Sequence, residues 1–279
     1  MANKCRLGSQ QQQSILIASS TPCISLQMYS KSNAKGADED GGLLLSTNGR
    51  SFDEAVKVIR FVNVPRAAST KTAAFAHDPL FEYMRNTPDA EESRLIRLLD
   101  YLTNFLQFIV RAHVQRALVV DGGYAYVAFG VPGDITSSLE RVASAMIRCI
   151  RKARTPEQNK RWSETMEKQD AAIQEAIGER IRGMFCVYDL AAHPDRQGRG
   201  YGSALMAAAN AKADDLGLAS WLVSSNINNT AFYESCGFVT VRQFAVGEDN
   251  PTWTKPPVVV SIMVREAHGR ANEREKAVA

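Results

Sequence analysis

The chain has 279 residues, of which 45% are hydrophobic, enough apolar material for one large domain or two small ones. Its 33 lysine and arginine residues nearly balance 30 acidic residues, for a net charge of +3, so charge gives no reason to expect a nucleic-acid partner. Apolar runs stay well short of the roughly 18 residues of a membrane span, so we expect no membrane association. Five scattered cysteines and four distant histidines predict a reduced, cytoplasmic protein without a metal site.

Residues 1–50 differ in composition from the rest of the chain. They contain a glutamine run, many serines and a Gly/Asp-rich piece, which predicts a disordered or weakly ordered segment. Met1–Ala37 has no acidic residue, a bias found in organellar transit peptides, so a mitochondrial location is the alternative to a cytoplasmic one. Arginine is scarce there, and a plain solvated tail fits as well. Residues 51–266 are predicted to form one domain, and 267–279 a charged tail.

The first predicted elements lie before residue 115. Val56–Phe61 alternates apolar and polar side chains, as a strand does. A helix should run from Val64 to Ala76, and His77-Asp78-Pro79 should end it. Glu91–Val114 carries a broad apolar stripe, which predicts a long helix packed on a sheet.

The second part of the chain begins with a β-hairpin signal. Asp121-Gly122-Gly123 separates two β-rich runs, Ala117–Val120 and Tyr124–Phe129. Strands and helices then alternate, which predicts a mixed sheet with helices on both faces. The remaining predicted helices are Ser137–Lys152, Glu157–Arg180, Ser203–Leu216 and the turn Thr230–Ser235, and the remaining strands are Met184–Ala192, Ala219–Ser224, Phe238–Val246 and Val258–Val264.

The most informative motif is the glycine-rich stretch between a predicted strand and a predicted helix. It reads Gln197-Gly198-Arg199-Gly200-Tyr201-Gly202 and is followed by Ser203. Strand, glycine turn and helix together present free backbone N–H groups to a phosphate, and glycines let the backbone approach the ligand closely. The motif therefore predicts a site for a phosphorylated ligand.

This motif resembles the Q/R-x-x-G-x-G/A signature of the GNAT superfamily, the GCN5-related N-acetyltransferases. Downstream, Asn229-Thr230-Ala231-Phe232-Tyr233-Glu234-Ser235-Cys236-Gly237-Phe238 resembles that family's second signature, in the same order and at a similar spacing. The resemblance covers roughly 56–265 and implies an α/β fold: a mixed, mostly antiparallel twisted sheet of about seven strands with a splayed central pair. A weaker resemblance, through Val64-Pro65-Arg66-Ala67, is to puromycin N-acetyltransferase and similar small-molecule enzymes.

The resemblance implies acetyl-CoA as the acetyl donor. Its pyrophosphate would bind the N–H groups from Gly198 to Ser203, and its pantetheine arm would pair with the strand near Leu190 and Ala192. Asn229 would contact the same ligand from the next segment. The residues expected at this donor site are Leu190, Ala192, Gln197, Gly198, Arg199, Gly200, Tyr201, Gly202, Ser203 and Asn229.

The implied reaction is direct acetyl transfer to a primary amine. Tyr233 stands where the family places a tyrosine near the leaving sulfur, so its phenol would be the general acid, and the Leu190 N–H could stabilise the oxyanion. By strict alternation Cys186, Tyr188, Leu190 and Ala192 share one face of their strand. Relatives place a glutamate or histidine base at positions that correspond to Cys186 and Tyr188. The base stays open: Tyr188 through water, a carboxylate such as Asp78, or bulk water.

The acceptor is expected to be a small-molecule amine, bound beside the first helix and its loop. Phe75, Asp78, Phe81 and Tyr83 are the residues expected to line its site, although packing over the sheet explains them equally well. A protein lysine or N-terminus is the alternative acceptor, and a non-catalytic acetyl-CoA-binding module is the alternative from another class. The sequence is compatible with a monomer or a homodimer.

Overall fold

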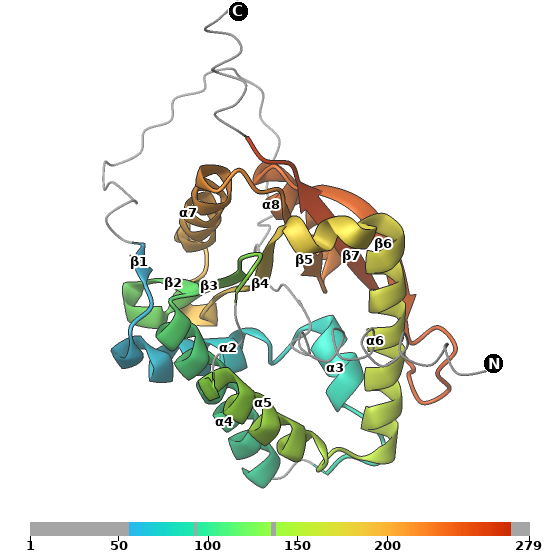
Figure 1. The fold of residues 1–279 in the computed structure, drawn as a ribbon. Helices are drawn as coiled ribbons and strands as arrows, with labels where there is room; N and C mark the ends of the chain where they lie inside the picture. The colour runs from blue at the N-terminus through green and yellow to red at the C-terminus, as the bar shows by residue number, and fades with distance from the viewer. Residues whose placement is uncertain (1–55, 92–93, 135–137, 269–279) are drawn as a thin grey trace, which may run out of the picture.

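The computed structural model describes residues 56–91, 94–134 and 138–268 (Figure 1). The predictions for residues 1–50 and for nearly all of the charged tail lie outside these described residues. Within the described ranges, no helix has both the length and the apolar character that crossing a membrane requires.

Seven strands of the described residues form a single sheet in the order β1-β2-β3-β4-β5-β7-β6. All neighbouring pairs are antiparallel except β4 and β5, which are parallel. The predicted fold class, a mixed and mostly antiparallel sheet, is confirmed. The strands are β1 (Lys57–Val58), β2 (Ala117–Val120), β3 (Ala125–Gly130), β4 (Phe185–Ala192), β5 (Ser220–Ser224), β6 (Val239–Val246) and β7 (Val258–Arg265).

Helices cover both faces of the sheet. In Figure 1, α7 lies on one side of strands β2–β4, and α2, α4 and α5 lie on the other. The helices are α2 (Val64–Ala74), α3 (Pro79–Arg85), α4 (Arg94–Val114), α5 (Ser138–Arg151), α6 (Pro156–Ala176), α7 (Tyr201–Asp215) and α8 (Thr230–Ser235). Burial follows this division, because side chains of α2, α3, α4 and α6 share one core cluster and those of α7 and α8 share another. We call the two sides the α2 face and the α7 face.

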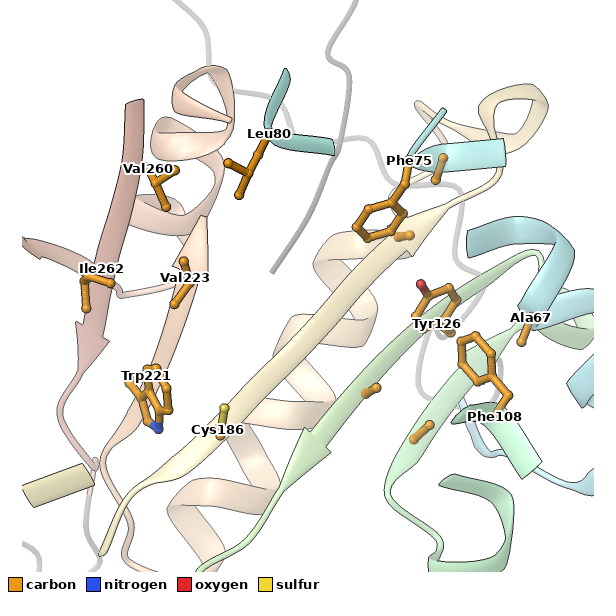
Figure 2. Packing of buried hydrophobic residues seen from close by; sticks show 14 of the residues in the cluster. Ala67, Phe75, Leu80, Phe108, Tyr126, Cys186, Trp221, Val223, Val260 and Ile262 are labelled. Carbon is orange, nitrogen blue, oxygen red and sulfur yellow. The ribbon is translucent and has the colours of Figure 1, made fainter. Parts of the chain in front are cut away.

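The core of the α2 face is built from aromatic and branched side chains on neighbouring strands. Phe108 of α4 packs edge-on against Tyr126 of β3, with ring centroids 4.6 Å apart. Figure 2 shows Trp221 and Val223 on β5 beside Ile262 on β7. Such apolar contacts hold α4 against β3 and fill the space between β5 and β7.

A β-bulge in β4 changes which of its side chains share a face. The pairing with β3 runs from Ala128↔Asp189 to Phe129↔Val187, so Tyr188 is an extra residue on the β4 side. The prediction that Cys186, Tyr188, Leu190 and Ala192 share a face was therefore wrong. Cys186 and Tyr188 pack on the α2 face, whereas Leu190 and Ala192 belong to the core of the α7 face.

The chain near its first strand also departs from prediction. The expected strand Val56–Phe61 is limited to β1, whose two residues pair with Val119 and Leu118. The Asn63 side chain accepts a hydrogen bond from the Arg60 N–H at 3.0 Å and turns the chain into a short 3-10 helix. Because Phe61 is 58% exposed there, its apolar character misled the alternation argument.

Two further boundaries differ from expectation. The segment after His77-Asp78 was predicted as a loop but forms α3, with Asp78 as its N-cap and Pro79 at its start. The predicted helix Glu157–Arg180 ends as α6 at Ala176. Gly178 follows with φ 57, and the chain continues as a 3-10 helix to Gly183.

Candidate functional site

Strands β4 and β5 separate at the centre of the sheet. Their ladder holds the pairs Phe185↔Ser220, Cys186↔Trp221 and Val187↔Leu222, and among the described residues it goes no further, although β4 continues to Ala192. The predicted splayed pair is therefore present. An edge that leaves its neighbour in this way can hydrogen-bond an extended ligand as an added strand.

The glycine loop follows β4 after a short 3-10 helix, Pro194–Arg196. Gly198 has φ 75 and Gly200, the N-cap of α7, has φ 76, conformations that glycine adopts without the penalty of other residues. A Cβ on Gly198 would meet no heavy atom within 4 Å, so there is open space beside this residue. The 15-residue α7 starts at this loop, so its unpaired N–H groups and the positive end of its dipole lie here. The arrangement fits a phosphate group.

Polar contacts fix the loop against its neighbours. Gln197 Nε2 donates to the Ala192 carbonyl at 3.4 Å, and the Tyr201 hydroxyl donates to Asp121 Oδ2 at 3.3 Å. The Arg196 guanidinium lies 4.7 Å from the centroid of the Tyr124 ring. Gly198, Arg199 and Gly200 are exposed, as is Ser203, whereas Gly202 is buried against the sheet. The exposed backbone is the part that a ligand can reach.

Tyr233 lies on the α7 face, and Asn229 lies four residues before it in the chain. Both are 1% exposed, and Asn229 ends a short 3-10 helix from which α8 continues. The Tyr233 ring packs against Phe238, with centroids 6.3 Å apart, in the same core cluster as Leu190. Three residues that the sequence assigned to the donor side, Leu190, Ala192 and Tyr233, are therefore brought together in one cluster.

Tyr188 lies on the opposite, α2 face. The Arg111 guanidinium of α4 stacks on its ring, 4.2 Å from the centroid. Its hydroxyl lies over Gly130, where a Cβ would overlap it. Tyr188 and Tyr233, the two predicted catalytic residues, are thus on opposite faces of the sheet.

The four predicted acceptor-site residues lie in or just before α3. Phe75 and Phe81 pack edge-to-face with centroids 5.1 Å apart. Tyr83 is fully buried, donates its hydroxyl to Glu164 of α6 and packs on Trp253, so its side chain belongs to the contact between α3 and α6. Burial and the neighbouring Glu164 hold the pKa of the Tyr83 phenol well above its usual value.

Asp78 is the second fully buried member of this group. Its Oδ1 accepts from the N–H groups of Leu80 and Phe81, each at 3.0 Å, and its Oδ2 accepts from the Ser225 hydroxyl at 2.9 Å. Burial raises the pKa of this carboxyl to about 7, although its hydrogen bonds act in the opposite direction. A carboxyl with such a pKa can change its protonation state near neutral pH.

Sequence reasoning missed an ion pair on the α2 face. Lys71 Nζ of α2 lies 2.8 Å from Asp189 Oδ2 at the bulge, and also donates to Gln107 Oε1 at 3.0 Å. The two charged side chains are 11% and 17% exposed. One signal was available: an aspartate inside an otherwise apolar strand requires a partner when it is buried.

Comparisons with known proteins agree with this geometry. Residues 165–240 match the sequence profile of the acetyltransferase (GNAT) domain. An uncharacterised N-acetyltransferase of Schizosaccharomyces pombe is 24% identical over 225 residues, which cover 80% of this chain and 88% of that protein.

One solved structure shows the same fold at low sequence identity. Arylalkylamine N-acetyltransferase 2 from Aedes aegypti superposes with a TM-score of 0.50 at 13% identity, over 76% of this chain and 97% of the other. A polyamine N-acetyltransferase of Drosophila melanogaster gives a TM-score of 0.47 at 15% identity, over 76% and 98%.

Proposed function

The chain carries an acetyltransferase domain of the GNAT family and is an acyltransferase, and from this premise we propose that it moves an acetyl group from acetyl-CoA to the primary amine of a small molecule. The observation that carries the proposal is the edge of β4 that leaves β5 beyond Val187, with the glycine loop after it in the chain at the start of α7. An extended thioester that ends in a pyrophosphate fits both parts together.

The residues that would hold the donor are those at the end of β4 and in the loop. Backbone groups of Leu190 and Ala192 would bind the amide-bearing arm, and the N–H groups from Gly198 to Ser203 would bind the pyrophosphate. Gln197 directly precedes this run, Arg199 lies within it, and Tyr201 begins the helix. Asn229 would approach the donor from the segment after β5. Acetyl-CoA would supply the activated acetyl group, and the protein would supply the binding contacts and the proton transfers.

Proton transfer at the leaving sulfur is assigned to Tyr233. Its ring is fixed against Phe238 in a buried cluster that also contains Leu190. A phenol held in this way can give its proton to the departing thiolate without reorganising. The Leu190 N–H would stabilise the oxyanion that develops on the acetyl carbonyl.

The group that takes the proton from the amine has three candidates. Tyr188 through water would act beside Arg111, whose guanidinium stacks on its ring. Asp78 has a pKa near neutrality but no exposed surface. Bulk water is the third candidate, and it would accept the proton directly from the attacking amine.

The closed packing of the acceptor segment favours a small amine. Phe75 is 1% exposed, and Asp78 and Leu80 are fully buried, so this segment covers the sheet closely. A protein lysine would need a wider opening beside the thioester. Phe75 and Phe81, whose rings meet edge-to-face, would pack against the acceptor's carbon skeleton.

The test is an assay of thiol release from acetyl-CoA over a panel of primary amines and lysine-containing peptides. We expect release with at least one small amine, and a Tyr233→Phe variant that binds acetyl-CoA normally but turns over about 10²-fold more slowly. Release with peptides alone would favour the protein-acceptor alternative. Normal acetyl-CoA binding without release for any acceptor would favour the non-catalytic module and contradict the proposal.

A further inference from the structure

The segment between α2 and α3 crosses from one splayed strand to the other. Figure 2 shows Phe75 beside β4 and Leu80 on the side of β5 and β7. Asp78 lies between these two residues in the chain. The segment therefore lies on the α2 face where β4 and β5 separate, on the side from which we expect the acceptor to approach.

Asp78 connects this segment to the end of β5 through side chains. One carboxylate oxygen caps α3 by accepting from the backbone of Leu80 and Phe81, and the other accepts from the Ser225 hydroxyl. Ser225 directly follows β5, and the chain from it reaches Asn229 four residues later. One carboxylate thus joins the start of α3 to the segment that leads into the proposed donor contacts.

Burial makes this connection stiff. Asp78 and Ser225 are both fully buried, so water cannot replace either partner of the hydrogen bond. Two charged or polar groups face the carboxyl from the elements packed against it: Arg85 of α3, whose charge lowers its pKa, and the Ser225 hydroxyl at the end of β5. Since both carboxylate oxygens are engaged inside the protein, a proton on the acceptor has no open path to them.

We propose that Asp78 is a positioning residue: by holding α3 to Ser225, it fixes the acceptor amine relative to the donor, while another group takes the proton. The effect of Asp78 on the acceptor amine rests on the proposed function. The structural link itself is independent of that function, so the two can fail separately. Displacing a bound reactant by about 1 Å can cost about 10²-fold in rate, which is why one such link matters.

Three variants separate positioning from proton transfer. Asp78→Asn keeps an oxygen for the helix cap and an amide that can donate to the Ser225 oxygen, so it preserves the link but cannot act as a base. Asp78→Ala removes both the cap and the link, and Ser225→Ala removes the link alone. Ser224→Ala is the matched control, because Ser224 is equally buried and its hydroxyl donates to the Asn226 carbonyl instead.

For the amine substrate, we expect Asp78→Asn to keep kcat/KM within about threefold of wild type, with the acidic limb of the pH profile in place. Asp78→Ala and Ser225→Ala should each lower kcat/KM by about tenfold or more, mainly through KM, and Ser224→Ala should leave KM within about twofold. If Asp78→Asn lowers kcat/KM as much as Asp78→Ala does and also loses the acidic limb of the pH profile, Asp78 is the base and the proposal fails. A Ser225→Ala enzyme with normal KM would equally overturn the proposal.

Hydrogen exchange gives a readout that needs no activity. The amides of α3 should exchange faster in Asp78→Ala and Ser225→Ala than in wild type, Asp78→Asn or Ser224→Ala. If these amides respond as expected but no amine is acetylated, the link stands and the proposed function fails. Unchanged exchange in Ser225→Ala would overturn the link itself.

Discussion

Lys71 Nζ and Asp189 Oδ2 lie 2.8 Å apart and join α2 to the bulge of β4. Gln107 of α4 accepts a second hydrogen bond from the same lysine, so three elements of the α2 face meet at one ammonium group. Asp189 lies two residues beyond Val187, where β4 stops pairing with β5. The ion pair therefore anchors the splayed part of β4 on the side opposite α7.

Breaking this pair should destabilise the protein more than an exposed ion pair would. Because the two side chains are 11% and 17% exposed, Lys71→Met or Asp189→Asn leaves a largely buried charge without the opposite charge beside it. We expect each single change to lower the free energy of unfolding by about 2–3 kcal/mol, and the double variant to lose clearly less than the sum. Urea denaturation of all four proteins measures this. Strictly additive losses would mean that the pair contributes no coupling.

Gly130 controls the position of the Tyr188 phenol. A Cβ at Gly130 would overlap the Tyr188 hydroxyl, so Gly130→Ala should displace the ring on which Arg111 stacks. If Tyr188 takes the proton of the amine through water, the variant should lower kcat by about tenfold or more without weakening acetyl-CoA binding. Gly183→Ala is the matched control, because a Cβ there meets no heavy atom within 4 Å. Equal kcat in both variants would remove Tyr188 from the reaction.

The buried Asp78 carboxyl should make stability fall as the pH rises. Its pKa is about 7 in the folded protein, against 3.8 when the group is solvated, so between these values the folded state binds the extra proton. Stability from this group is then fully present below about pH 4 and is lost as the pH approaches 7, by on the order of 4 kcal/mol if the whole shift is realised.

Asp78→Asn removes this titration. Its unfolding free energy, measured by urea denaturation from pH 4.5 to 7.5, should lack the decline that wild type shows over that range. Other titrating groups affect both proteins alike, so the difference between the two curves reports on Asp78. Parallel curves would show that the pKa of the Asp78 carboxyl is not raised in the folded state.

Local signals in the sequence predicted the parts of the site that depend on backbone conformation. Gly198 and Gly200 lie where left-handed φ values are required, and the chain after them forms α7. The helical turn Thr230–Ser235 is α8, residue for residue. The alternation of strands and helices predicted a mixed sheet, and β4 and β5 form its parallel pair.

Features that depend on distant partners could not be predicted in this way. The bulge at Tyr188 arises from the pairing of β4 with β3, and no local pattern marks the extra residue. The Lys71–Asp189 contact joins residues 118 positions apart. By contrast, α3 was missed although its signal was present. Asp78-Pro79 is a favourable N-cap and first residue of a helix, but the sequence analysis took it only as the end of the preceding helix.

Calorimetric titration of acetyl-CoA into two glutamate variants at opposite ends of α7 tests the central claim most directly. Gly198 and Gly217 both have positive φ and open space around a Cβ, so Gly198→Glu and Gly217→Glu introduce the same charge and a similar backbone strain. We predict that Gly217→Glu binds acetyl-CoA like wild type, whereas Gly198→Glu loses at least about 10²-fold in affinity, because its carboxylate would oppose the pyrophosphate. Equal affinity in the two variants would contradict donor binding at the glycine loop.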